Sequence, residues 1–380
     1  MDKMEQVVIF LVILVVASYF LLATPVMMDD GFHYEGFTEA LAQGRLDFQS
    51  FYGFQGLSIL SVPIFWLTGS HISIIIASAI LYLLSLLLAY LIGKNFYNDR
   101  RAGVYFMTLI LLMPYVYTTM MRGFQEAALL FFILLTIWGA LNKKLWTPVV
   151  WAFGGIVKPF ALVLFPLFVK DFLPKSLVRS DLTRVTWVLT ALAMGAVYLG
   201  ISYYQTGHLV NNAAINSYQG NFDVGNPPPL IESFTIGAKG FLRIGANLLL
   251  PYRKILLSPL AVVLGGLALL KFKELRLRRE IILAILLNVF LVGGLTFSFS
   301  KYLLPMVVLL ALTSVSYLLK YKWLIFLVLA DSVFVFMPIW NYFGRSFWDN
   351  AIVYYMPLYL SVFIIVRTYA FGQVRDKIKD

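Results

Sequence analysis

The segment VVIFLVILVVASYFLLATPV, Val7 to Val26, is apolar almost throughout and is followed, after two methionines, by the polar segment DDGFHY, Asp29 to Tyr34. An apolar run of about 20 residues is long enough for an α-helix to cross a bilayer. Two acids directly after such a run are costly against lipid, so Asp29 and Asp30 are expected to face water or an enclosed cavity. No small-residue cleavage site follows, so the apolar run is predicted to be a retained signal anchor.

The composition predicts an all-α polytopic membrane protein with one transmembrane domain over residues 1–380. Of its 380 residues, 61% are hydrophobic and only 13% are charged, which is far too apolar for a water-soluble domain. The absence of Cys excludes disulfides and thiolate metal sites. We expect about twelve spans, with a range of about 10 to 13. The runs start at Val7, His71, Ala102, Gln125, Leu145, Phe160, Val185, Ile255, Ile281, Tyr302, Trp323 and Ile352.

The net charge of +11 is a topology signal and predicts no nucleic-acid partner. Of the 30 Lys and Arg residues, 21 fall in the termini and the alternate loops that share one predicted side. The positive-inside rule then places both termini in the cytoplasm and the Asp29–Asp30 pair outside. A plasma-membrane location with an extracytoplasmic site is therefore expected.

Two predicted outer segments are long, residues 27–70 and residues 205–254. The first is expected to contain amphipathic helices, one of them from Phe32 to Gln43 with Gly44 as its stop. The second contains five asparagines between residues 211 and 226, followed directly by three consecutive prolines. It is predicted to be an irregular flap that can close over a site.

The segment DDGFHY at residues 29–34, followed by AQGRL at residues 42–46, resembles the first outer loop of C-type (GT-C) glycosyltransferases. This superfamily includes protein O-mannosyltransferases and the aminoarabinose transferase of lipid A. Three further segments are similar to motifs of the family in the expected order: KNFYNDRRA at 94–102, GIVKP at 155–159 and KYLLP at 301–305. The sequence departs from the pattern where Gly31 replaces a frequent Glu and where the usual K-P-P or H-P-P motif is missing.

The resemblance implies an inverting glycosyltransferase that uses a polyprenyl-phosphate-linked sugar and acts on a hydroxyl of a glycan, lipid or protein acceptor. Asp30 would be the general base that takes the acceptor's proton, and Asp29 would orient the acceptor or raise the pKa of its neighbour. Cations would stabilise the departing phosphate. The candidates for that role are Lys158, Lys301, Arg122, Arg243, Arg253 and Lys254.

His33, Tyr34 and Glu126 are the candidates for positioning acceptor or substrate. No cofactor is implied with certainty. His33 and Glu126 could complete a divalent Mg or Mn site with Asp29 or Asp30. Hard cations prefer oxygen ligands and do not need His, so metal dependence stays open, with Asp29, Asp30 and Glu126 as the candidate ligands.

Structural interpretations compete with several of these roles. Lys158 and Lys301 can be interfacial snorkelling lysines, and Arg122 can simply pair with Glu126 four residues later. Asp331, inside an apolar run, is expected to form a structural hydrogen bond to another span, for instance near Asn288.

Two other functions remain alternatives, a lipid-linked glycan flippase or transporter and an O-antigen-ligase-like or polymerase-like enzyme. A flippase predicts functional charges spread through the spans. Here the charges inside the apolar runs are sparse, Asp331 being the main one, which favours the enzyme.

Overall fold

The computed structural model describes residues 30–50, 54–69, 72–113, 116, 119–120, 122–172, 179–207, 257–293, 300–328 and 331. These residues form helices joined by turns and contain no strand, which confirms the all-α prediction. The predicted spans that begin at Val7 and Ile352 lie outside the described residues.

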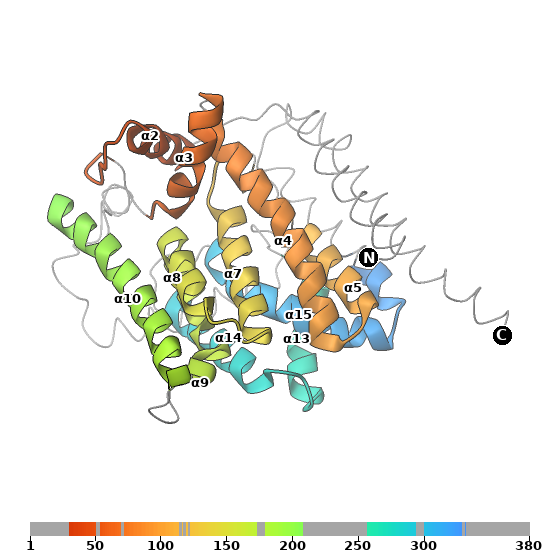
Figure 1. The fold of residues 1–380 in the computed structure, drawn as a ribbon. Helices are drawn as coiled ribbons and strands as arrows, with labels where there is room; N and C mark the ends of the chain where they lie inside the picture. Colours follow the sequence, from red (N-terminus) through yellow and green to blue (C-terminus); the bar gives the residue numbers. More distant parts are fainter. Residues whose placement is uncertain are drawn as a thin grey trace, which may run out of the picture.

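The described helices form one bundle with a crossing pair at one end (Figure 1). In this view α4, α7, α8 and α10 lie side by side, and α2 and α3 lie across their upper ends. The elements are α2 Asp30–Ala42, α3 Gly56–Thr68, α4 Ser73–Tyr97, α5 Arg100–Leu111, α7 Glu126–Leu141, α8 Thr147–Val157, η1 Pro159–Leu167, α9 Val169–Phe172, α10 Arg179–Thr206, α13 Pro259–Lys271, α14 Arg278–Gly293, η2 Ser300–Leu303 and α15 Leu304–Lys320.

Two helices in the described part of the chain are long and apolar enough to cross a membrane, Ser73–Tyr97 and Leu182–Thr206. The predicted count of twelve spans is therefore not confirmed. The runs that start at Leu145 and Phe160 become α8 and the 3-10 helix η1, which have 11 and 9 residues. At 1.5 Å per residue, α8 is about 16 Å long, roughly half the thickness of a hydrocarbon core.

The chain turns back between α8 and η1 because of Pro159. A residue that precedes proline is disfavoured in the α conformation, and Lys158 has an extended backbone with φ −154° and ψ 134°. The apolar composition continues on both sides of this turn. Hydropathy alone therefore cannot show that two short helices replace one or two full spans.

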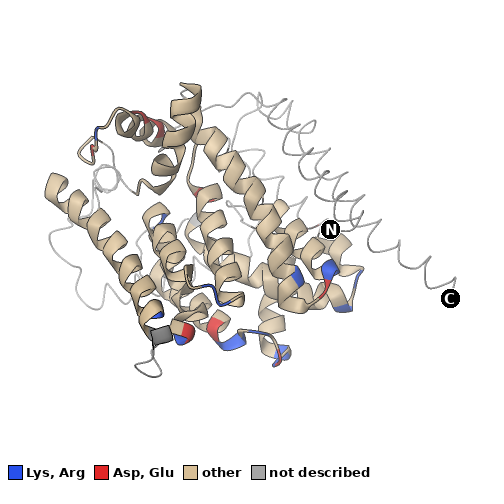
Figure 2. Cartoon of the chain, in the orientation of Figure 1, with Lys and Arg blue, Asp and Glu red and all other residues tan. Residues whose placement is uncertain are grey.

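Lys and Arg residues gather at the end of the bundle opposite α2 and α3 (Figure 2). This end contains the end of α4, the start of α5, the α7–α8 turn and the α13–α14 loop. We call it the basic end. These loops were predicted to share one side, and the orientation of that side relative to a membrane stays a prediction.

The structural role expected for Asp331 is confirmed, but with another partner than Asn288. The Asp331 carboxylate accepts hydrogen bonds from the Ser258 hydroxyl and, at 2.9 Å, from the backbone N–H of Leu260 at the start of α13. Asn288 instead accepts from the backbone N–H of Met306 at 3.2 Å. A carboxylate at the first turn of a helix meets N–H groups that have no partner within the helix.

The first testable expectation concerns Asp99, which caps α5 at the basic end. Its carboxylate accepts from the backbone N–H of Arg101 at 2.8 Å and pairs with the Arg101 guanidinium at 2.6 Å. Partial burial raises the pKa of the Asp99 carboxyl, but the hydrogen bonds and charge of Arg101 lower it more, so the net pKa lies below 3.8. Its stabilisation is complete above the unfolded-state pKa and is lost as pH falls through the lower folded-state pKa.

We expect Asp99→Ala to reduce stability at neutral pH by about 1 kcal/mol, the usual loss on removing an N-cap. Asp99→Asn keeps a capping oxygen and loses the charge, so it should be less harmful at pH 7 and should weaken the acid dependence. Thermal unfolding in detergent between pH 7 and pH 3 measures both effects. Equal unfolding temperatures for Asp99→Ala and wild type would contradict the capping role.

Candidate functional site

The predicted helix of the first outer segment is α2, Asp30–Ala42, and it ends at the expected glycine. Gly44 has φ +79°, and the backbone N–H of Arg45 donates to Ala40 O at 2.8 Å. A left-handed glycine after the last turn is a common helix stop. Phe37 is fully buried while Phe32 is 63% exposed, so one side of α2 packs inward.

The first turns of α2 carry three of the predicted site residues, and two of these, His33 and Tyr34, have described side chains. Asp29 lies outside the described residues, and Asp30 begins α2 with its side chain outside them. His33 is half-buried and Tyr34 is buried. The carbonyl of Tyr34 accepts from the hydroxyls of Thr38 at 2.8 Å and Ser58 at 2.9 Å, which fixes α2 against α3.

Glu35 is a buried acid that the sequence interpretation missed. It is 4% exposed, and it accepts from the Ser73 hydroxyl at 2.8 Å and from the backbone N–H of Ile74 at 3.0 Å. These groups begin α4, where a negative charge is favourable because the helix dipole is positive there. Glu35 follows the DDGFHY segment directly, five residues after Asp30, and this position could have indicated it as a candidate site residue.

A buried ion pair joins two residues that the sequence predicted separately. The ammonium of Lys158 lies 2.6 Å from a carboxylate oxygen of Glu126, and these side chains are 12% and 0% exposed. Glu126 begins α7 and Lys158 follows the last residue of α8. The pair therefore holds two helix ends at the same depth in the bundle.

The segment between α2 and α3 lies against the residue next to this pair. The side-chain amide of Gln125 donates to the carbonyl of Phe54, and Gln125 is only 1% exposed. Among the described residues its other amide atom, Oε1, has no hydrogen-bond partner. A buried oxygen without a donor is costly, so this atom is a candidate contact for a ligand.

The start of α3 also packs directly onto the end of α8. A Cβ added to Gly56 would lie 2.6 Å from Cγ2 of Val157, the residue before Lys158. Only a glycine permits this approach without a shift. The backbone N–H of the preceding Gln55 donates to the Tyr198 hydroxyl of α10 at 3.0 Å. The α2–α3 pair thus covers the end of α8.

The two long segments that the sequence predicts to lie outside meet at Gln205. Its side chain accepts from the backbone N–H of Phe48 at 2.9 Å and donates to the carbonyl of Leu46 at 2.8 Å. The side chain of Gln49 donates to the Gln205 carbonyl at 2.6 Å. The remainder of the predicted flap beyond residue 207 lies outside the described residues.

The GIVKP and KYLLP segments are also brought together. Phe160, which follows Lys158 and Pro159, stacks on Tyr302, which follows Lys301; their ring centroids are 4.4 Å apart with an 18° angle. Lys301 lies in η2, and its side chain is outside the described residues. The backbones that carry Lys158 and Lys301, two of the predicted phosphate-binding residues, are therefore neighbours.

Of the other predicted cations, only Arg122 lies among the described residues. Arg122 is half-buried in a turn before α7, where its N–H donates to Thr119 O at 3.1 Å. Because α7 begins at Glu126, the predicted helical spacing between Arg122 and Glu126 does not apply. Arg243, Arg253 and Lys254 lie outside the described residues.

The predicted metal site has one ligand candidate, Glu126, with a described side chain. Within the described ranges, no group of three His, Asp or Glu side chains is close enough to hold a metal ion. The carboxylate of Glu126 pairs with Lys158. The structure thus gives the metal proposal no support, and the question stays with Asp29 and Asp30.

The second testable expectation is strong coupling between Glu126 and Lys158. Glu126→Gln leaves a nearly buried ammonium without its counter-charge, and Lys158→Met leaves a buried carboxylate, so each should cost about 3–5 kcal/mol. The double variant removes both charges and should cost clearly less than the sum. Unfolding of all four proteins in detergent gives the coupling free energy.

The Lys170–Glu280 pair at the basic end is a matched control, because the Lys170 side chain is 54% exposed. An exposed pair contributes about 0–1 kcal/mol, so Glu280→Gln should have a small effect. Additive losses at Glu126 and Lys158 would show that the two charges do not stabilise one another.

No family model matches this chain, and neither a curated protein nor a solved structure is similar enough to count as a match.

Proposed function

We propose that the protein is a membrane glycosyltransferase that moves a sugar from a polyprenyl-phosphate carrier to a hydroxyl acceptor. Transfer would occur at the end of the bundle that carries α2 and α3, opposite the basic end. With the basic end in the cytoplasm, this site would be extracytoplasmic. The enzyme would resemble C-type glycosyltransferases.

The observation that carries this proposal is the convergence of three sequence segments at one place. The first outer segment contacts Gln125 through Phe54 and contacts α8 through Gly56. Beneath it lies the Glu126–Lys158 pair. The stacked rings of Phe160 and Tyr302 bring the Lys301 backbone to the same region. Segments far apart in sequence therefore meet where the resemblance expects one active site.

Exposed apolar helix faces support a membrane location. On α10, Leu182, Leu189 and Leu192 are 67%, 58% and 58% exposed. On α4, Ile80 and Leu84 are 46% and 40% exposed along one stripe. Contiguous apolar surface of this kind is unfavourable in water and ordinary against lipid.

The proposed chemistry assigns separate roles to acid and cations. Asp30 takes the proton of the acceptor hydroxyl as the oxygen attacks the anomeric carbon, and the carrier phosphate leaves with the bonding electrons. Lys158 and Lys301 stabilise the charge on that phosphate. Glu126 positions the Lys158 ammonium. His33 and Tyr34 lie next to Asp30 on α2, where they can orient the acceptor.

A lipid-linked glycan transporter is the second candidate, and the buried ion pair favours it. The sequence argument that charges inside the bundle are limited mainly to Asp331 is wrong, because Glu35 and Glu126 are buried and Lys158 is nearly so. Buried pairs between helices also occur in substrate paths of transporters. The ligase-like alternative depends on residues 205–254, most of which lie outside the described residues.

A transfer assay with a synthetic polyprenyl-phosphate sugar tests the enzyme proposal. Asp30→Asn should lower kcat by about 10²–10⁴, the usual contribution of a general base. Glu39→Gln, another carboxylate change on α2, is the matched control and should keep the wild-type rate. Lys301→Ala should raise KM for the donor or lower kcat, because it removes a phosphate partner.

Three results would contradict the assignment. Full transfer by Asp30→Asn in a folded protein would remove the base. Unchanged donor kinetics in Lys301→Ala would remove the phosphate role. Carrier translocation in liposomes without any sugar transfer, for a panel of acceptors, would instead establish the transporter.

A further inference from the structure

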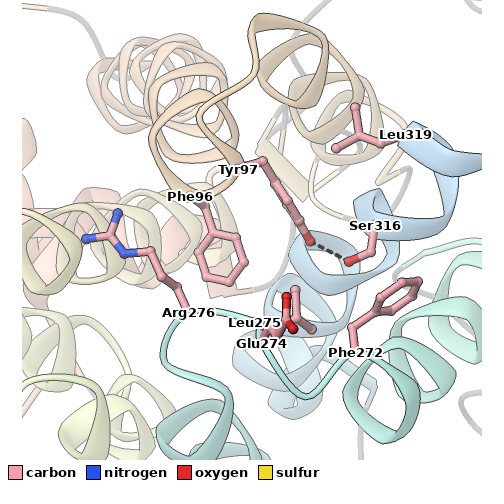
Figure 3. Close-up of a pocket in the computed structure, with 8 residues that line it drawn as sticks. All are labelled: Phe96, Tyr97, Phe272, Glu274, Leu275, Arg276, Ser316 and Leu319. Carbon is pink, nitrogen blue, oxygen red and sulfur yellow. Dashed lines mark hydrogen bonds between the residues drawn. The ribbon is translucent and has the colours of Figure 1, made fainter.

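A cavity of about 340 Å³ opens at the basic end, away from all the predicted site residues (Figure 3). It lies between the end of α4, the α13–α14 loop and the last turns of α15. The residues that line it are Phe96, Tyr97, Phe272, Glu274, Leu275, Arg276, Ser316 and Leu319. The proposed transfer reaction gives this cavity no role.

The lining favours a cation, although the surrounding surface is basic. Figure 3 shows the rings of Phe96 and Tyr97 and the carboxylate of Glu274 around one space, while the side chain of Arg276 points away from it. The guanidinium of Arg276 donates instead to the carbonyls of Asn95 and Leu141, both at 3.2 Å. Aromatic faces and a carboxylate attract positive charge.

Glu274 differs from neighbouring acids because its charge is not neutralised within the described residues. Asp99 pairs with Arg101 and Glu280 pairs with Lys170 at this same end. For Glu274 the described part of the chain offers no ion pair or hydrogen bond, although Lys273 is adjacent in sequence. Its carboxylate is therefore available to a ligand.

We propose that this cavity binds the headgroup of phosphatidylethanolamine. The primary ammonium would donate to the Glu274 carboxylate and the Ser316 hydroxyl and lie against the rings of the cavity. Lys271, the last residue of α13, and Lys273, in the loop that follows, are both exposed and would neutralise the phosphate. A purely anionic headgroup would instead meet the repulsion of Glu274.

An exposed apolar face leads to the cavity and can accommodate an acyl chain. Val263, Leu267 and Leu270 lie on one side of α13 and are 44%, 45% and 73% exposed. The helix ends at Lys271, directly before the cavity residue Phe272. The inference rests on the proposed membrane location, and it does not depend on the transfer reaction.

Native mass spectrometry of the full-length protein tests this assignment. The protein would be incubated with equal amounts of phosphatidylethanolamine, phosphatidylcholine and phosphatidylglycerol with identical acyl chains. We expect preferential retention of phosphatidylethanolamine. Glu274→Gln should lower that retention about tenfold, the effect of losing one hydrogen bond between charged groups. Asp171→Asn, a carboxylate change in α9 at the same end but outside the cavity, should leave it unchanged.

Phe272→Leu provides a second variant that keeps an apolar side chain and removes a ring, and it should also reduce retention of phosphatidylethanolamine. Stronger binding of phosphatidylglycerol, equal retention of all three lipids, or wild-type retention by folded Glu274→Gln would overturn the proposal. Sugar transfer, assayed in the same samples, is independent. A protein that retains the lipid but transfers no sugar would contradict only the proposed function.

Discussion

The buried pair of Glu126 and Lys158 constrains the whole end of the bundle that carries α2 and α3. An isolated charge in a protein interior is very costly, so the two side chains must stay together once they are buried. They belong to different helix ends, the start of α7 and the end of α8. Their contact therefore fixes where these helices meet, and the turn at Pro159 allows the chain to leave in the opposite direction.

This constraint also explains why the first outer segment packs inward. Because α8 stops at Val157, space remains above it, and Gly56 brings α3 into direct contact with that residue. Gln125 reaches the carbonyl of Phe54 from the neighbouring helix start. The Phe54 carbonyl, in the segment that joins α2 and α3, is thereby satisfied within the protein.

Sequence patterns predicted those features that depend on near neighbours. The helix predicted from Phe32 to Gln43 agrees with α2 to within two residues at each end, and Gly44 marks its stop. The long apolar run that starts at His71 predicted α4. Patterns failed where distant residues decide the outcome. Nothing near Lys158 indicates that Glu126 is its partner, and nothing near Glu35 indicates the start of α4. Hydropathy likewise could not distinguish the short α8 and η1 helices from full spans, because the interior of a bundle is as apolar as lipid.

The two ends of the bundle combine acids and cations in different ways, and this difference separates the two proposals. At the α2–α3 end, Glu126 neutralises a buried lysine, so a phosphate that approached would share a cation already held in position. At the basic end, cations are abundant and exposed, while Glu274 faces a ring-lined cavity without a described counter-charge. In the two proposals, Lys158 acts together with Lys301 on an anionic leaving group, whereas Glu274 acts on an ammonium. Formal net charge alone, at +11, would have predicted anion binding at both.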